Sequence, residues 1–281
     1  MFKWYGLLGI LLIVFLEFTL FFQIQPFIVW FTPFVWIGYI LVVDSIVYMM
    51  KKDSLLMHHR LKFLQLFLLS ISVWYTFEIY NKFSHGWFYS NLPSTALIKY
   101  TMGTLSFATI IPAVFETFDL VRQFHFFGKL NLKLKIPTNK HVLEIFIALG
   151  LIFLIIPVLW KTPWVWVFVW TGFIFLLDPL LYIFHNERSL IAQIKKKKFS
   201  MILALVITGY VVGFFWELWN YWAYTKWYYT VPILDNFRIF EIPVLGFLAY
   251  GPFAIELYVI YNFVRLLFSK KILGRFVPSG K

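Results

Sequence analysis

Residues 214–222 read Phe-Phe-Trp-Glu-Leu-Trp-Asn-Tyr-Trp and place a carboxyl group and an amide in a segment otherwise apolar enough for a lipid bilayer. Such groups are expensive in hydrocarbon and usually serve a function there. A similar combination occurs near the end of the chain, where residues 251–256 read Gly-Pro-Phe-Ala-Ile-Glu. Both segments predict membrane-spanning helices that carry buried polar groups.

The composition of the whole chain agrees with a membrane protein. Of the 281 residues, 61% are hydrophobic and only 14% are charged, which is more apolar surface than a soluble domain of this length needs. The absence of cysteine excludes disulfides, thiolate metal sites and cysteine nucleophiles. The net charge of +12 is interpreted as the charge bias of membrane-protein loops, and we expect no nucleic-acid partner.

Eight apolar segments, each near the roughly 20 residues that cross a bilayer core as a helix, alternate with polar loops. The sequence therefore predicts an all-α integral membrane protein with about eight transmembrane helices, at residues 5–25, 27–50, 61–80, 98–121, 142–160, 164–184, 200–222 and 242–268.

Basic residues are distributed very unevenly between the two sides of this predicted bundle. Most of the 25 Lys and Arg residues fall on the side that holds both termini and the loops near residues 51–62, 122–140 and 188–198. Because cytoplasmic loops carry the excess of basic residues, we expect the N- and C-termini to be cytoplasmic. The run Lys195, Lys196, Lys197 and Lys198 is predicted to contact anionic lipid headgroups.

The two halves of the chain share a pattern of polar and aromatic residues at a nearly constant offset. Shared hydrophobicity does not explain the matching polar pairs, which are Asp44 and Asp178, Glu78 and Glu217, Asn81 and Asn220, and Glu116 and Glu256. A repeat of this length predicts a duplicated 4+4 bundle with parallel repeats, at residues 1–134 and 135–281.

The polar residues inside the spans are the candidates for chemistry. Glu217 and Asn220 lie three residues apart, on one face of a helix, and Glu256 lies one turn after Pro252. A carboxyl group in an apolar pocket suits general acid or base catalysis, and aromatic faces can stabilise a cation. The candidate catalytic residues are Glu217, Glu256, Asn220, Glu78 and Glu116, and the candidate substrate-binding residues are Trp216, Trp219, Trp227, Pro252 and Asn81.

Each of these groups also has a structural alternative, because Glu and Asn side chains can hold helices together by hydrogen bonds. Asp44 and Asp178 lie nearer the cytoplasmic ends of their spans, where a structural role as partners of loop cations is favoured. The histidines show no paired spacing on one helix face, so no metal site is predicted. No phosphate loop, nucleotide fingerprint or Ser-His-Asp arrangement indicates a cofactor or a hydrolase.

The second half resembles the lycopene-cyclase-type membrane domains of carotenoid biosynthesis over about 45 residues. The resemblance rests on Trp216-Glu217 with Asn220, on residues 227–229, Trp-Tyr-Tyr, and on Pro252 with Glu256. The family pattern has adjacent acidic residues close to the proline, whereas here Glu256 stands alone. Those domains are used in pairs, and the resemblance implies an isomerase or lyase acting on a polyisoprenoid lipid.

Three functions follow as hypotheses. The first is a membrane enzyme acting on an isoprenoid, carotenoid or other lipid by acid/base chemistry, with a cavity between the halves lined by Trp216, Trp219, Glu217 and Glu256. The second is a proton-coupled transporter or channel, which requires a water path from both faces. The third is a structural subunit with a solid interior, no pocket and paired acidic residues.

Overall fold

The structure is a computed structural model that describes residues 1–124, 136–184, 187–231 and 236–268. Within these residues, eight helical segments are long and apolar enough to cross a membrane, which confirms the prediction of an all-α polytopic membrane protein. The predicted boundary between residues 134 and 135 lies outside the described residues, as does the chain after residue 268.

The long helices match the predicted spans to within a few residues at most ends. The described helices are α1 (Trp4–Phe21), α2 (Phe31–Lys51), α3 (Leu55–His58), α4 (Arg60–Ser84), α5 (Ala96–Val121), α6 (Lys140–Leu159), α7 (Trp166–Ile183), α8 (Leu190–Lys195), α9 (Phe199–Trp222), α10 (Val244–Phe247) and α11 (Tyr250–Leu267). Two 3₁₀ turns, η1 (Phe27–Trp30) and η3 (Pro163–Val165), precede α2 and α7.

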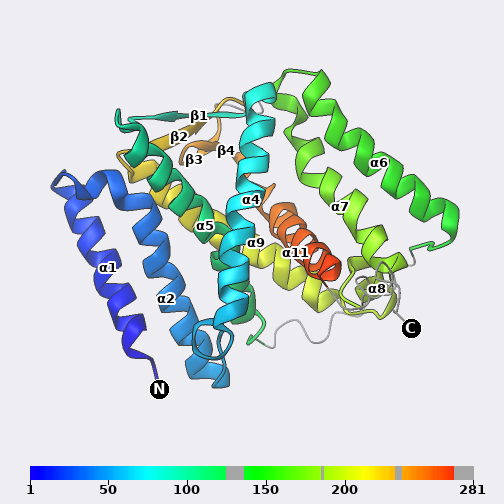
Figure 1. Cartoon of the computed structure of the whole chain (residues 1–281), viewed down its shortest axis with the longest axis horizontal. Helices are drawn as coiled ribbons and strands as arrows, with labels where there is room; N and C mark the ends of the chain where they lie inside the picture. Colours follow the sequence, from blue (N-terminus) through cyan, green and yellow to red (C-terminus); the bar gives the residue numbers. More distant parts are fainter. Residues whose placement is uncertain (125–135, 185–186, 232–235, 269–281) are drawn as a thin grey trace, which may run out of the picture.

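Two helix hairpins, α1–α2 and α6–α7, lie on opposite flanks of the molecule (Figure 1). Small residues bring the paired backbones close together, because membrane helices associate by packing and not by a hydrophobic effect. A Cβ atom added at Gly9 would lie 2.6 Å from the carbonyl oxygen of Gly38, and one added at Gly150 would clash with the backbone nitrogen of Leu176. A larger residue at any of these contacts would push its hairpin apart.

Helices α4, α5, α9 and α11 fill the space between the two hairpins (Figure 1). Helix α4, from the first half of the chain, contacts the α6–α7 hairpin, and α9, from the second half, contacts the α1–α2 hairpin. On α4, the ring of Tyr80 lies 6.5 Å from that of Phe173 on α7, and its hydroxyl donates to the carbonyl oxygen of Leu154 on α6 at 3.1 Å. On α9, the ring of Trp219 lies 5.9 Å from that of Tyr39 on α2. The two halves therefore share one interior.

Four short strands lie together at one end of the bundle (Figure 1). β1 (Trp87–Ser90) pairs antiparallel with β2 (Lys226–Tyr229), and β3 (Arg238–Ile239) pairs with β4 (Ile242–Pro243). In the first pair Phe88 lies opposite Tyr228, and their rings stack at 5.4 Å. The sequence predicted only polar loops here. Aromatic residues also favour strands, which is the signal for this missed pairing.

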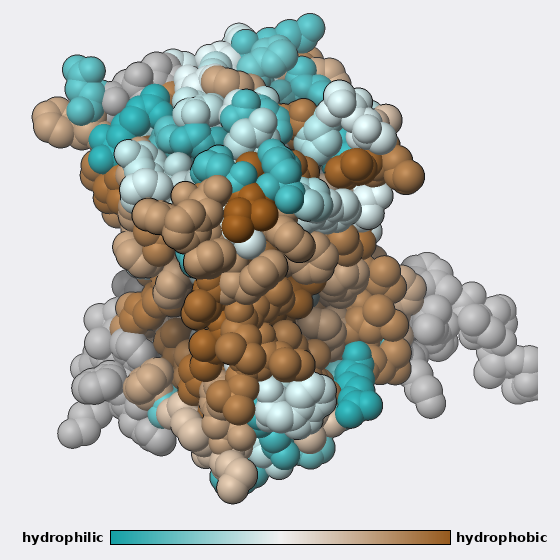
Figure 2. Space-filling view, turned by 90° about the vertical axis from the view of Figure 1, so that its left-hand side faces the viewer, coloured by the Kyte–Doolittle hydropathy of each residue, from teal (hydrophilic) through white to brown (hydrophobic). Residues whose placement is uncertain are grey.

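The surface of the molecule is divided into layers by hydropathy. The face in Figure 2 has a broad apolar band between two caps rich in polar residues. Exposed apolar side chains are frequent on the outer helices, among them Leu11 and Val14 on α1 and Ile152 and Ile155 on α6. An exposed apolar belt of this kind is what a lipid-embedded protein presents to the bilayer, so the protein contacts membrane lipid.

Candidate functional site

A cavity of about 450 Å³ lies between the two halves, at the end of the bundle that carries the strands. Ligand pockets in proteins span roughly 300–1,000 Å³, so it has room for a small molecule or a lipid chain. Its wall is mostly apolar and draws on α2, α4, β1, α5, α7, α9, β2 and α11. Its tryptophans within the described residues are Trp36, Trp74, Trp87, Trp170, Trp216 and Trp227.

Glu78 is the carboxyl group that lines this cavity directly, among the residues that the structure describes. Three donors converge on its Oε1: the indole Nε1 of Trp74 at 3.1 Å, the indole Nε1 of Trp87 at 3.2 Å and the hydroxyl of Tyr89 at 2.5 Å. These bonds fix the carboxyl group against the wall, where it can accept or donate a proton to a bound molecule.

Glu217 lies behind the wall, fully buried in α9, and contacts the cavity through two phenols. Its Oε1 accepts hydrogen bonds from the hydroxyl of Tyr229 at 2.6 Å and from the hydroxyl of Tyr250, and both tyrosines line the cavity. Its Oε2 is buried with no hydrogen-bond partner. A carboxyl group joined to a cavity by hydroxyls is arranged for proton relay.

The strand tyrosines remain protonated donors in these contacts. Burial, followed by the negative charge and hydrogen bond of Glu217, raises the pKa of Tyr229 well above its ordinary value. Burial and Glu78 raise the pKa of Tyr89 in the same way. Each phenol therefore keeps its proton at neutral pH and presents it to its carboxyl group.

Asn81 and Asn220 hold the two strands onto the ends of their helices. Nδ2 of Asn81 donates to the carbonyl oxygen of Trp87 at 2.9 Å, and its Oδ1 accepts from the backbone nitrogen of Trp87 at 3.1 Å. Asn220 makes the same two bonds to Trp227, at 2.8 and 2.9 Å. Neither amide lines the cavity, so both position the tryptophans that do.

Glu116 and Glu256 are fully buried, and neither lines the cavity. All four of their carboxyl oxygens lack a hydrogen-bond partner. Trp219 is buried against α1, where its Nε1 donates to Oε1 of Glu17 at 3.0 Å, and Pro252 is exposed. The cavity wall thus includes Trp216, Trp227 and Glu78 from the predicted site residues, but not Glu217, Glu256, Trp219 or Pro252.

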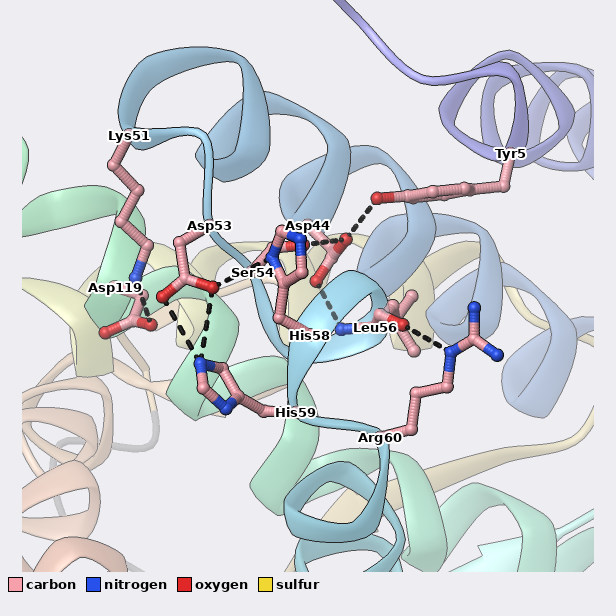
Figure 3. Close-up of polar contacts among 10 residues, drawn as sticks. All are labelled: Tyr5, Asp44, Lys51, Asp53, Ser54, Leu56, His58, His59, Arg60 and Asp119. Atoms are coloured by element: carbon pink, nitrogen blue, oxygen red, sulfur yellow. Dashed lines mark hydrogen bonds and ion pairs between the residues drawn. The ribbon is translucent and has the colours of Figure 1, made fainter.

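The two buried aspartates lie at the opposite end of the bundle and hold short helices in place. Asp44 accepts from the hydroxyl of Tyr5 at 2.5 Å, from Oγ of Ser54 at 2.9 Å and from the backbone nitrogen of Leu56 at 2.9 Å (Figure 3). Asp178 accepts from the backbone nitrogens of Leu190 and Ile191 at 2.6 and 3.0 Å. These partners are hydroxyls and backbone amides at helix starts, whereas the sequence favoured loop cations as partners.

Asp53 lies close to Asp44 in Figure 3 and contacts His58 and His59. Desolvation raises the pKa of Asp53, but the hydrogen bond and charge of His59 and the hydrogen bond of His58 outweigh it and hold the pKa below its ordinary value. Within the four described ranges, no group of three or more His, Asp or Glu residues is arranged to hold a metal ion.

The residues that sequence reasoning missed are the tyrosines on the wall. Tyr89 and Tyr229 lie two residues after Trp87 and Trp227, and that repeated Trp-x-Tyr spacing was a usable signal. Tyr250 lies beside Gly251 at the start of α11, and nothing local marks it. Comparison with known protein families, with characterised proteins and with solved structures gives no match.

Proposed function

We propose that this chain is an integral membrane enzyme that acts on an isoprenoid or other lipid held in the aromatic cavity. The observation that carries the proposal is the wall itself, which combines the carboxyl group of Glu78 with the hydroxyls of Tyr229 and Tyr250, both bound to Glu217. A structural subunit with a solid interior needs no such cavity, which makes that alternative the weaker one.

The proposed chemistry is an isomerisation of an alkene. A tyrosine hydroxyl turns from Glu217 to the cavity and gives its proton to one carbon of a double bond, whose π electrons form the new C–H bond. The phenolate left behind takes a proton from Glu217, which is protonated at the start of this step and becomes a carboxylate. The cation left on the other carbon lies among indole faces, which stabilise it. Glu78 then removes a proton from a neighbouring carbon, and the C–H electrons restore a double bond. The substrate keeps its formula, and water at the mouth returns the protons.

The test begins by purifying the protein in mild detergent and identifying copurifying lipids or pigments by mass spectrometry. Conversion of that lipid is then compared between wild type and the Glu78→Gln and Glu217→Gln variants. Each variant should lose about 100-fold or more in rate, because general acid and base groups contribute at least that much. Glu144→Gln changes an exposed carboxyl group on α6 and is the control. Full activity in Glu78→Gln would remove the proposed base.

The resemblance to lycopene-cyclase-type domains supports the isoprenoid class, and carotenoids within it, as the first substrates to try. The duplication is part of the same proposal. What supports it is that equivalent side chains make equivalent contacts in both halves, as Asn81 and Asn220 do with Trp87 and Trp227. The 4+4 arrangement would place the cavity on the axis between the repeats, where parallel-repeat proteins bind their ligands.

The membrane orientation is likewise a proposal, in which both termini are cytoplasmic and the strands face the opposite side. The uneven distribution of basic residues supports it. All four side chains are exposed, but Lys195 donates to the hydroxyls of Thr138 and Tyr182 and Lys196 pairs with Glu187, which leaves the pair Lys197 and Lys198. This exposed pair is the part of the run best placed for anionic headgroups.

A further inference from the structure

The mouth of the cavity lies between the end of α4 and the start of α5. The exposed part of the cavity wall comes from these two helices and the loop between them, with Ile79, Leu92 and Tyr100 among the exposed apolar side chains. Deeper in, the hydroxyls of Tyr75 and Thr104 lie 2.6 Å apart and join the two helices. A molecule therefore enters above this contact, close to the membrane surface.

Two lysines line the cavity at this mouth: Lys82, in the last turn of α4, and Lys99, in the first turn of α5. Among the described residues, neither ammonium group forms an ion pair, and Lys99 lies over the ring of Tyr100 at 5.0 Å. Glu78, one turn deeper than Lys82, is already bound at Oε1 by three donors. Glu78 and Lys82 interact electrostatically, so the two lysines outnumber the one carboxyl group that lines the cavity within the described residues. The mouth therefore keeps an excess of positive charge, above an apolar cavity lined by aromatic side chains.

We propose that the cavity binds a single-chain amphiphile with an anionic headgroup, a carboxylate or a phosphate, held by Lys82 and Lys99 while its chain lies among the tryptophans. Lysines at the ends of membrane helices favour anions at the headgroup level, and the apolar wall favours a hydrocarbon chain. This inference rests on the proposed function only in assuming that the cavity is the binding site. It narrows the substrate from any lipid to one that carries a negative charge.

Binding is measured by scintillation proximity on purified protein, with radiolabelled palmitate as the anionic probe and hexadecanol as its neutral counterpart. Palmitate should bind about tenfold more tightly, equivalent to about 1.4 kcal/mol. The Lys82→Gln/Lys99→Gln variant should lose that preference. Lys161→Gln is the matched control, because Lys161 is exposed on the same side of the bundle and does not line the cavity. Equal affinity for the two probes, or a preference unchanged in the double variant, would overturn the proposal.

Gly103 provides a second variant that tests the site without removing charge. It lines the cavity, and a Cβ atom added there meets only the ring of Phe107, at 4.0 Å, so a larger residue is accommodated by the fold. Gly103→Leu should weaken binding of both probes about tenfold by filling the mouth, and Gly103→Ala should not. Binding of palmitate that Gly103→Leu leaves unchanged would place the probe elsewhere and overturn the proposal.

Competition identifies the source of the headgroup. Farnesyl phosphate that displaces palmitate far better than farnesol would assign a prenyl phosphate, and displacement only by fatty acids would assign a carboxylate; either result supports an anionic amphiphile. Turnover measurements distinguish a failure of the proposed acid–base chemistry from a failure of the headgroup inference. A charge preference together with full turnover in Glu78→Gln rejects the acid–base roles and keeps this inference, whereas turnover without a charge preference rejects this inference alone.

Discussion

Single residues decide how each carboxyl group in the strand-bearing end of the bundle is used. Glu78 on α4 and Glu217 on α9 each lie three residues before an asparagine that binds a strand, yet of the two only Glu78 lines the cavity. The difference comes from Tyr250, whose hydroxyl bonds to Glu217 and stands between it and the space. Glu78 is bound by the indole of Trp74 instead. One carboxyl group therefore contacts a ligand directly, and the other acts through phenols.

The two strand tyrosines offer a matched test of this arrangement. Tyr229→Phe leaves Glu217 Oε1 with one donor, from Tyr250, while its Oε2 already has none. Tyr89→Phe leaves Glu78 with two indole donors. Losing a donor to a buried acceptor costs about 1–3 kcal/mol, so we expect Tyr229→Phe to reach the upper part of that range and Tyr89→Phe the lower.

The free energy of unfolding of each tyrosine variant is measured in mixed micelles that contain an increasing fraction of dodecyl sulfate. Equal losses in the two tyrosine variants would show that the remaining indole donors do not compensate at Glu78. A larger loss in Tyr89→Phe would contradict the difference that the hydrogen bonds predict.

The sequence was most informative about these residues where the partners lie on the same helix. The three-residue spacing of Glu217 and Asn220 correctly placed both on one buried face of α9. It could not reveal that Asn220 bonds the backbone of Trp227, or that Glu217 bonds Tyr229, because those contacts depend on how the chain turns after α9. The cavity wall was harder still, since it draws on many separate segments.

At the scale of elements, the pairing of β1 with β2 joins the two halves on the strand-bearing side. Each strand follows the helix that carries its carboxyl group, and each is held by the asparagine of that helix. The two strands then pair in the register Trp87 with Tyr229 and Tyr89 with Trp227. A shift of this register by one residue would turn the cavity-lining side chains to the other face of the ribbon.

The register can be tested by cross-linking, because the natural chain contains no cysteine. Phe88 and Tyr228 lie directly opposite each other, and opposed residues in antiparallel strands have Cα atoms about 4.5–5.5 Å apart, within the range for a disulfide. The Phe88→Cys/Tyr228→Cys variant should therefore cross-link under mild oxidation. Phe88→Cys/Lys226→Cys joins a diagonal pair about 7–8 Å apart and should cross-link poorly.

Protease cleavage between residues 122 and 140, which the sequence predicts to form a polar loop, followed by non-reducing electrophoresis, reads out this result. A covalent bond between the strands keeps the two fragments together. Efficient cross-linking of the diagonal pair, with none of the opposed pair, would mean that the strands pair in another register.

At the scale of the whole molecule, hydropathy predicted the number and order of the spans well because each helix in a bilayer must satisfy its own backbone. It could not predict how α4 and α9 reach across to the hairpin of the opposite half, as Tyr80 and Trp219 do. Such contacts depend on shape and on polar groups far apart in the chain. The number of spans can therefore be predicted from short stretches of sequence, whereas the shared interior and its cavity cannot.

The two sides of the molecule differ in charge, and this difference makes a prediction about orientation. Lys198 lies at the start of α9, on the side of the bundle with α3 and α8, and Lys161 lies between α6 and α7, on the side with the strands. Both side chains are exposed. Since basic loops are retained in the cytoplasm, Lys198→Cys should face the cytoplasm and Lys161→Cys the opposite compartment.

A membrane-impermeant maleimide applied to intact cells should then label Lys161→Cys and not Lys198→Cys, and inside-out vesicles should reverse that result. Neither substitution removes an ion pair, because both ammonium groups lack one within the described residues. Labelling of Lys198→Cys in intact cells would place the strands, the cavity mouth and its two lysines on the cytoplasmic side. A ligand would then enter from the inner leaflet, so this measurement also decides which leaflet supplies the proposed amphiphile.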